Sequence, residues 1–253
     1  FYGAKRTVGY VPFDSESLVT GKLFEDIREA AHDLADPEVN DAVVIINLCV
    51  PTASGVPLDL LPKEINGVRI VGIDVPGFGV PTHAEAKDVL AGAMLEYARG
   101  EIEAGPVTRP IQSESQKDKP TVALVGEMFP VDAITIDRLL DSLGAAAGPV
   151  VPTREWRELY AALDCKVGAM IHPFYAATAR QFRAAGRPLV GSAPVGVEGT
   201  VAWLEAMGEV LGADKASLDA AISTQKSAIR AALNNNPIDA KITMSGYEGS
   251  ELL

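Results

Sequence analysis

The fold class of this chain is indicated by the stretch Ala42–Leu48, which reads AVVIINL. A near-continuous run of β-branched residues is typical of a strand that is buried on both faces of a parallel sheet. Apolar residues at helical spacing over 18–34 precede it, and Val68–Ile73 predicts a second strand after it. A helix is expected over Thr82–Arg99, with its first residue as N-cap and Glu85 as capping-box partner. Strands that alternate with single helices predict an α/β fold with parallel sheets.

The same alternation resumes downstream of a polar stretch and predicts a second α/β unit. Its expected strands are 121–126, 149–152, 167–171 and 188–191, and its expected helices are 134–143, 153–163, 175–185, 199–211 and 217–233. Residues 241–246 then repeat the strand-and-glycine pattern of 121–126. We therefore expect a first α/β domain at 1–104, a linker at 105–118, a second α/β domain at 119–236 and the start of a third at 237–253.

Composition and charge exclude several classes of protein. The chain has 253 residues, and its 22 Lys and Arg against 34 Asp and Glu give a net charge of −12. This acidic balance disfavours binding to nucleic acid, because a duplex-DNA site needs a basic face that neutralises phosphates. No apolar run reaches the roughly 18 residues expected of a transmembrane helix. Two cysteines cannot build a disulfide framework, which fits a reduced, cytoplasmic compartment.

Cys49 is the main candidate for chemistry, because it follows the strand 42–48 and open α/β sheets bind ligands at the carboxyl ends of strands. Its thiol could ligate a metal or an iron–sulfur cluster, act as a nucleophile, or pack in the core, and position alone favours the core. No C-x-x-C motif and no second cysteine within 100 residues accompanies it. The chain begins at Phe1 rather than Met, so we expect an internal piece of a longer polypeptide that is incomplete at the N-terminus. Cys165, between a predicted helix and a predicted strand, is expected to be structural.

Two histidines and one loop are further candidates for a site. His172 directly follows a strand and could face a ligand cleft, or form a contact between domains instead. His83 lies in the first turn of a predicted helix, where a capping or surface role is the alternative. Residues 73–83 place two prolines and two glycines around Phe78. This loop either positions backbone near a ligand or a partner chain, or only leads into the helix.

Other motifs carry less information. Residues 20–22 read TGK but lack the rest of a phosphate-binding loop, so we expect this chain to bind no nucleotide. Glu127 and Glu248 follow predicted strand ends and are most simply solvated turn residues.

Several long runs of the sequence are similar to one known family. They are Asn47–Leu58, Leu61–Ile70, Gly72–Lys87, Gly126–Pro130, Val151–Tyr160, His172–Tyr175 and Ser245–Leu253. These runs resemble the chlorophyllide a reductases of the nitrogenase-like family, in the subunit type designated Y. The resemblance extends over essentially the whole chain.

The resemblance implies a fold of three Rossmann-like α/β domains per subunit. It implies pairing with a homologous Z subunit in a heterotetramer. It also implies transient docking of an X subunit, a separate iron–sulfur protein. In this system the X subunit, and not this chain, binds and hydrolyses ATP. The implied substrate is chlorophyllide a, whose C7=C8 double bond in ring B is reduced in bacteriochlorophyll a biosynthesis. The implied cofactor is a [4Fe-4S] cluster shared by the Y and Z subunits near their interface, through which the electrons pass.

The resemblance also implies a role for Cys49 as a thiolate ligand of that cluster, which replaces the core interpretation. The remaining ligands would lie N-terminal to Phe1 or on the partner chain. Protons must reach two ring carbons, and His172 and His83 are candidate donors that no family motif supports. Two other functions remain open: a dark-operative protochlorophyllide reductase, which acts on ring D, and a non-catalytic α/β binding protein in which Cys49 is part of the core.

Overall fold

The computed structural model describes residues 8–114, 116–126, 133–172 and 174–237. The described helices are α1 (Ser15–Thr20), α2 (Lys22–Leu34), α3 (Cys49–Ala53), the 3-10 helix η1 (Leu58–Leu60), α4 (His83–Ala104), α5 (Ala133–Asp141), α6 (Trp156–Asp164), α7 (Ala176–Ala184), α8 (Gly196–Leu211) and α9 (Lys215–Asn235). The described strands are β1 (Ala42–Asn47), β2 (Glu64–Ile65), β3 (Val68–Asp74), β4 (Thr121–Val125), β5 (Ala146–Val151), β6 (Val167–Met170) and β7 (Leu189–Val190).

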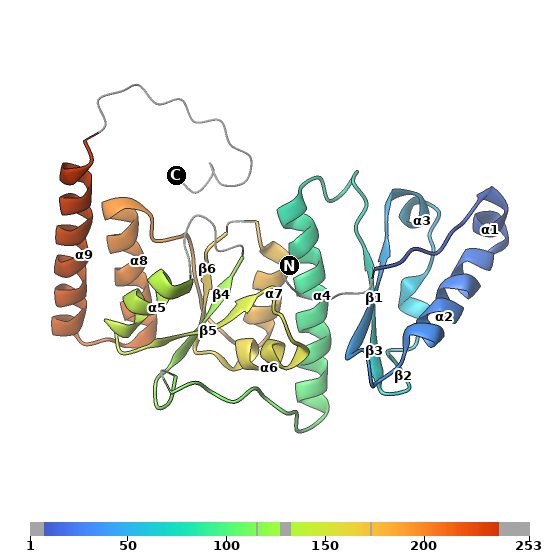
Figure 1. The fold of residues 1–253 in the computed structure, drawn as a ribbon, viewed down its shortest axis with the longest axis horizontal. Coiled ribbons are helices and arrows are strands. Elements are labelled where there is room, and N and C mark those ends of the chain that lie inside the picture. The colour runs from blue at the N-terminus through green and yellow to red at the C-terminus, as the bar shows by residue number, and fades with distance from the viewer. Residues whose placement is uncertain (1–7, 115, 127–132, 173, 238–253) are drawn as a thin grey trace.

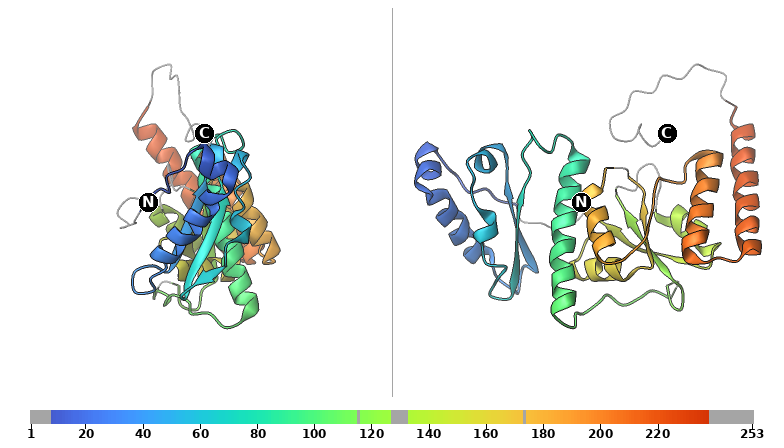
Figure 2. Two further views of the ribbon diagram at one scale, coloured as in Figure 1. Left: turned by 90° about the vertical axis from the view of Figure 1, so that its right-hand side faces the viewer. Right: turned by 180° about the vertical axis from the view of Figure 1, so that it is seen from behind.

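The elements form layers along the long axis of the molecule (Figure 1). From right to left, helix α2 is followed by the β1–β3 sheet, helix α4, the helices α6 and α7, the β4–β7 sheet, the helices α5 and α8, and finally α9. Figure 2 shows the same order from behind. The predicted α/β architecture is therefore confirmed, with α4 lying between the two sheets.

The first sheet has the order β1-β3-β2. Strand β1 pairs with β3 in parallel, whereas β2 pairs with β3 antiparallel through a turn at Asn66 and Gly67. Both turn residues have positive φ, 53° and 84°, as a two-residue hairpin requires. The sequence analysis did not predict the short strand β2. The expectation that β1 is buried on both faces is wrong at its carboxyl end, where Ile46 is 49% exposed.

The second sheet is wholly parallel, with the order β5-β4-β6-β7. Because β5 lies on one side of β4 and β6 on the other, the chain reverses its direction across the sheet between β4 and β6. Open α/β sheets bind ligands outside the carboxyl ends of strands at such a switch point.

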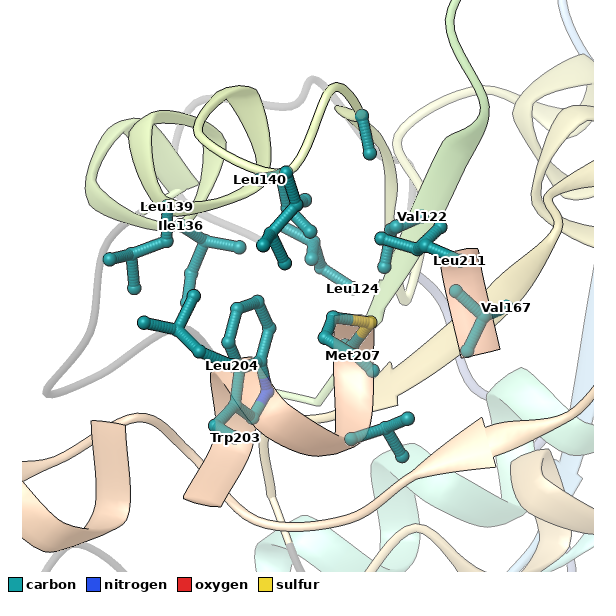
Figure 3. Packing of buried hydrophobic residues seen from close by; sticks show 14 of the residues in the cluster. Val122, Leu124, Ile136, Leu139, Leu140, Val167, Trp203, Leu204, Met207 and Leu211 are labelled. Atoms are coloured by element: carbon teal, nitrogen blue, oxygen red, sulfur yellow. The ribbon is translucent and has the colours of Figure 1, made fainter. Parts of the chain in front are cut away.

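The side chains of β4 point alternately into two cores, as the period of a strand requires. Leu124 packs with α5 and α8 in a cluster where Figure 3 shows Trp203 and Met207 beside it. Val125 packs on the opposite face, against α6 and α7. Both strand residues are fully buried, which accounts for the apolar run that predicted this strand.

Helix α4 contributes to a core that spans both sheets. Its buried residue Leu95 belongs to one continuous cluster with Ile73 of the first sheet and Val125 of the second. The capping box predicted for this helix is confirmed, since Thr82 and Glu85 bond each other's backbone N–H groups. The helix continues to Ala104, and the described residues of 105–118 form no helix or strand. The division into domains at 104 stays a prediction.

Several predicted helix boundaries are wrong, among them the start of α8, which is Gly196 and not residue 199. The helix expected over 18–34 is interrupted at Gly21, whose φ of 78° ends α1 and precedes α2. The helix expected to open at Thr153 begins at Trp156, because Glu155 is its N-cap and forms a capping box with Glu158. The predicted strand 241–246, the rest of the third unit, Glu127 and Glu248 lie outside the described residues.

Candidate functional site

The carboxyl ends of β1 and β3 bring two loops together at the upper edge of the first sheet in Figure 1. The last residues of the two strands, Asn47 and Asp74, are paired in register. The segments that follow them therefore leave the sheet side by side. One segment is helix α3, which begins at Cys49, and the other is the loop 75–81 that leads to α4.

Cys49 is exposed, and its sulfur receives a hydrogen bond from this loop. The backbone N–H of Gly77 donates to Cys49 Sγ over 3.1 Å. A Cβ atom built on Gly77 would lie 3.5 Å from the same sulfur, at ordinary van der Waals distance. The loop thus places a backbone donor on the sulfur and leads into a capped helix, and its approach to a ligand or a partner chain stays a prediction.

Buried and paired polar groups fix the segment that carries Cys49. The Asn47 side chain is 2% exposed, and its Nδ2 donates to the backbone carbonyl of Val56 over 3.1 Å. The carbonyl of Asn47 accepts from the N–H of Val75 over 2.8 Å. The hydroxyl of Thr52 donates to Asp74 Oδ1 over 3.0 Å. Helix α3 and the facing loop are therefore tied to the same two strand ends.

Apolar side chains surround this edge. They are Ile46, Leu48, Val50 and Phe78, and each is between 49% and 70% exposed. A thiolate among apolar groups suits iron, because thiolates are the usual ligands of iron–sulfur clusters and the surrounding polarity tunes the potential. Within the described ranges, no group of three or more His, Cys, Asp or Glu side chains could hold a metal ion. Among the described residues, Cys49 therefore offers one ligand for a cluster at this edge. The remaining ligands would have to come from other sequence or from a partner chain.

The two candidate histidines lie on other elements than this thiol, which is at the start of α3. His83 is exposed at the first position of α4, and no hydrogen bond or ion pair between described residues joins it to Cys49. His172 follows β6 on the second sheet, at the switch point next to β4. The structure thus does not gather the three candidate residues into one site, and the roles of the histidines stay predictions.

His172 is 2% exposed and packed against its neighbours. Its ring lies 5.3 Å from that of Phe174 and 5.7 Å from that of Tyr175, and its Nδ1 accepts from the N–H of Phe174. Gly126 has a φ of 112°, and a Cβ there would lie 2.4 Å from His172 Cβ. Only glycine fits this approach between β4 and β6.

Cys165 is structural, as its position predicted. It is 1% exposed, and burial raises the pKa of its thiol to about 11. Its Sγ donates to the carbonyl of Ala161 over 3.3 Å. A thiol that stays protonated is a poor metal ligand and nucleophile.

Sequence reasoning missed a polar cluster at the opposite edge of the first sheet. The Glu101 carboxylate accepts from Arg69 Nε at 2.6 Å, Trp156 Nε1 at 2.9 Å and the Tyr160 hydroxyl at 2.7 Å. Burial, followed by the bond to Glu101, raises the pKa of Tyr160. These residues line a groove of about 870 Å³ between the first sheet, α4 and α6. They come from three distant segments without a common motif, so only the fold reveals them.

Comparisons with known proteins show that the sequence of this chain is similar to oxidoreductases. Residues 3–248 match the family described as nitrogenase component 1 type oxidoreductase. The chain is 69% identical over all its 253 residues to the chlorophyllide reductase 52.5 kDa chain of Cereibacter sphaeroides, of which it covers 50%. It is 25% identical over 224 residues to one subunit of the light-independent protochlorophyllide reductase of Methylobacterium radiotolerans, which is 84% of this chain and 40% of that protein.

A solved structure has the same fold. The structure described as nitrogenase Cp1 at pH 5 superimposes with a TM-score of 0.57 at 17% identity, over 88% of this chain and 44% of that one. The chain spans about half the length of the curated relatives it matches, or less. No described helix is both long enough and apolar enough to cross a membrane.

Proposed function

We propose that this chain, which belongs to the nitrogenase component 1 type oxidoreductase family, is part of the Y subunit of a chlorophyllide a reductase. The proposed reaction adds two electrons and two protons to the C7=C8 double bond of ring B, which becomes a single bond. An X subunit, a separate iron–sulfur protein, hydrolyses ATP and supplies the electrons. A homologous Z subunit completes the cytoplasmic heterotetramer. This step belongs to bacteriochlorophyll a biosynthesis.

The proposed substrate is supported by the difference in sequence identity to the chlorophyllide reductase chain and to the protochlorophyllide reductase subunit. Identity to the chlorophyllide reductase chain is far higher, and it extends over every residue of this chain. Identity to the protochlorophyllide reductase subunit is low and leaves part of the chain unmatched. We therefore favour chlorophyllide a over protochlorophyllide as the substrate.

The observation that carries the proposal is the exposed thiol of Cys49 at the carboxyl end of β1. We propose that Cys49 is a thiolate ligand of a [4Fe-4S] cluster shared with the Z subunit, whose other ligands come from sequence N-terminal to this chain and from the partner. When bound, the cluster supplies one-electron transfer. Ile46, Leu48 and Phe78 would exclude water from the thiolate, since their exposed apolar surfaces adjoin this edge.

The proton donors are a separate part of the proposal. His83 is exposed at the start of α4, so it could exchange protons with solvent and with a substrate that binds there. His172 is buried at the switch point of the second sheet and would act only if substrate enters there. We keep both as candidates for protonating the ring carbons.

Anaerobic iron analysis and EPR spectroscopy test the cluster. The full-length protein is purified with its Z partner as wild type, Cys49→Ala and Cys165→Ala. We expect Cys49→Ala to lose or alter the [4Fe-4S] signal in an assembled complex, and Cys165→Ala to keep it, because Cys165 is buried away from the site. An unchanged signal in Cys49→Ala would show that Cys49 is not a ligand. Absence of iron from the wild type would favour a binding protein.

Turnover with each pigment tests the substrate. The wild-type complex is given the X subunit, ATP and a reductant, with chlorophyllide a or protochlorophyllide as substrate, and the product is identified by absorption spectroscopy and mass. We expect a gain of two hydrogens on chlorophyllide a alone. Reduction of protochlorophyllide alone would support the alternative activity on ring D.

A further inference from the structure

Strand β1 lies at an edge of the first sheet and pairs with β3 on one side. The carbonyls of Asp41 and Asn47 accept from the N–H groups of Arg69 and Val75, so every second residue from Asp41 to Asn47 faces β3. The backbone groups of the residues between them therefore point away from the sheet, and no hydrogen bond between described residues reaches them. These outward groups form the free edge of β1, which consists of Ala42, Val44 and Ile46.

The other edges of the two sheets are protected. Strands β2 and β7 have two residues each, and a very short edge strand offers little backbone for pairing. Strand β5 is longer, but Pro149 lacks an N–H, and side chains bond both outward groups of Ala147. The N–H of Ala147 donates to Asp137 Oδ1, and its carbonyl accepts from Gln116 Nε2, over 2.7 Å each. Strand β1 reads AVVIIN, without proline or charge, so among the described edges it alone is both long and unprotected.

The side chains of β1 are apolar on both faces and are incompletely covered. Helices α2 and α4 flank the two faces of this sheet (Figure 1). Val44 is only partly buried against the cluster that includes α4, and Ile45 is only partly buried against the cluster that includes α2. By contrast, the central strand β4 is buried at every residue from Val122 to Val125. An apolar run such as that of β1 is typical of a central strand, so its sequence fits a position with a neighbour on each side.

We propose that the free edge of β1 binds one further β-strand, supplied by the part of the full-length polypeptide that lies outside these 253 residues. Backbone hydrogen bonds to the free edge provide the pairing. Because helices cover both faces of the sheet, the added strand is apolar on both of its faces, as β1 is. The chain covers 50% of the chlorophyllide reductase chain of Cereibacter sphaeroides, so half of a protein of that length is available to supply the strand. This pairing depends neither on a metal ligand nor on the proposed reaction.

Hydrogen exchange of the wild-type, full-length protein, purified in the complex that it forms, tests whether the edge is covered. Residue resolution comes from mass spectrometry with electron-transfer fragmentation. We expect the amides of Val44 and Ile46 to exchange as slowly as those of Val43 and Ile45, which face β3. Ile111 is the fast-exchanging reference, because it is 99% exposed. Exchange of Val44 and Ile46 at the rate of an open strand edge would overturn the proposal, and no variant has to fold for this result.

Photo-cross-linking in the same full-length complex identifies the strand that binds. The photoreactive residue p-benzoylphenylalanine replaces Ile46, whose side chain is half exposed, or Ile111 as the matched control in the linker. Mass spectrometry then identifies the captured peptide and distinguishes capture within one polypeptide from capture of a second copy. We expect the variant at Ile46, and not the control, to capture an apolar run of the same polypeptide from outside these residues. Capture of a second copy, of another subunit or of a segment within residues 1–253, or no capture at Ile46, would overturn the proposed source of the strand.

Discussion

The two cysteines of this chain differ in their surroundings. Cys49 is exposed beside a backbone donor, whereas Cys165 is enclosed between α6 and the second sheet. Gly148 lies in strand β5, and a Cβ on it would lie 2.8 Å from Cys165 Sγ. Strand β5 therefore approaches the sulfur as closely as glycine allows. Burial thus keeps the Cys165 thiol protonated and away from any metal, whereas the Cys49 thiol is accessible from solvent.

The buried thiol predicts a loss of stability at alkaline pH. Because the pKa of Cys165 is raised from 9.0 to about 11, the folded state keeps a proton that the unfolded state releases. The stabilisation is complete below pH 9 and is lost as the pH rises towards 11. We expect the free energy of unfolding to fall over this range, and Cys165→Ala to remove this thiol's share of the fall. Denaturant unfolding of both proteins at about pH 8 and about pH 10.5, on either side of the unfolded thiol's pKa, measures it, and parallel curves would contradict the expectation.

Glu101 gives a second prediction at the scale of one residue. Its carboxylate accepts three hydrogen bonds from partly buried groups, so Glu101→Gln leaves donors facing an amide that is itself a donor. We expect a loss of about 1–3 kcal/mol in the free energy of unfolding. Glu103→Gln is the control on the same helix, because its ion pair with Arg99 is exposed and contributes under about 1 kcal/mol. Equal losses would show that the cluster is not cooperative.

At the scale of elements, strands were predictable and short connections were not. The strands β3 and β4 follow from apolar runs, because each is buried on both faces. Helix α4 follows from its capping box. Helix α3 has no apolar period over its five residues, so nothing in its sequence distinguishes it from a loop. The hairpin of β2 does have a signal, the Asn66-Gly67 pair, which is typical of a two-residue turn.

The contact between α4 and α7 shows how one helix face joins the two units. Asp88 is 5% exposed, and its carboxylate accepts the N–H groups of Ala177 and Thr178 over 2.7 Å each. It thus caps α7 from another helix. One turn further along α4, a Cβ on Gly92 would lie 2.8 Å from the Cβ of Ala177. Neither contact could be predicted from sequence, because the partners lie far apart along the chain.

This contact predicts opposite effects for the same substitution on one helix. Gly92→Ala should destabilise the protein by about 1–3 kcal/mol, because the new methyl group collides with Ala177 and its backbone. Gly100→Ala should stabilise it by about 0.4–1 kcal/mol, because this glycine lies in the helix with open space around it. Chemical unfolding measures both, and hydrogen exchange should show faster exchange in α7 only for Gly92→Ala. A loss of stability in both variants would show that the space around Gly92 and Gly100 does not decide the effect of the added methyl group.

At the scale of the whole molecule, the position of α4 bears on the predicted division at 104. The linker 105–118 separates the two α/β patterns in the sequence, and composition alone suggests independent domains. The structure nevertheless places one continuous cluster across the first sheet, α4 and the second sheet. Layer order is a tertiary property, so the capping box and the apolar residues that predict α4 do not reveal its second partner.

Leu95 provides the test, because it is fully buried on α4 within this shared cluster. Leu95→Ala should cost about 2–5 kcal/mol through the cavity it leaves. If the cluster makes the two sheets one cooperative unit, amides of β3 and β4 should lose hydrogen-exchange protection together and by the same free energy. Leu23→Ala, on the far face of the first sheet, is the matched control, since it removes a buried leucine from a separate cluster that includes no residue of α4 or the second sheet. If both variants lose hydrogen-exchange protection in β3 alone, the chain has two independent domains that meet at residue 104. If Leu95→Ala loses protection in both sheets, α4 is the element that couples the proposed cluster edge to the second sheet.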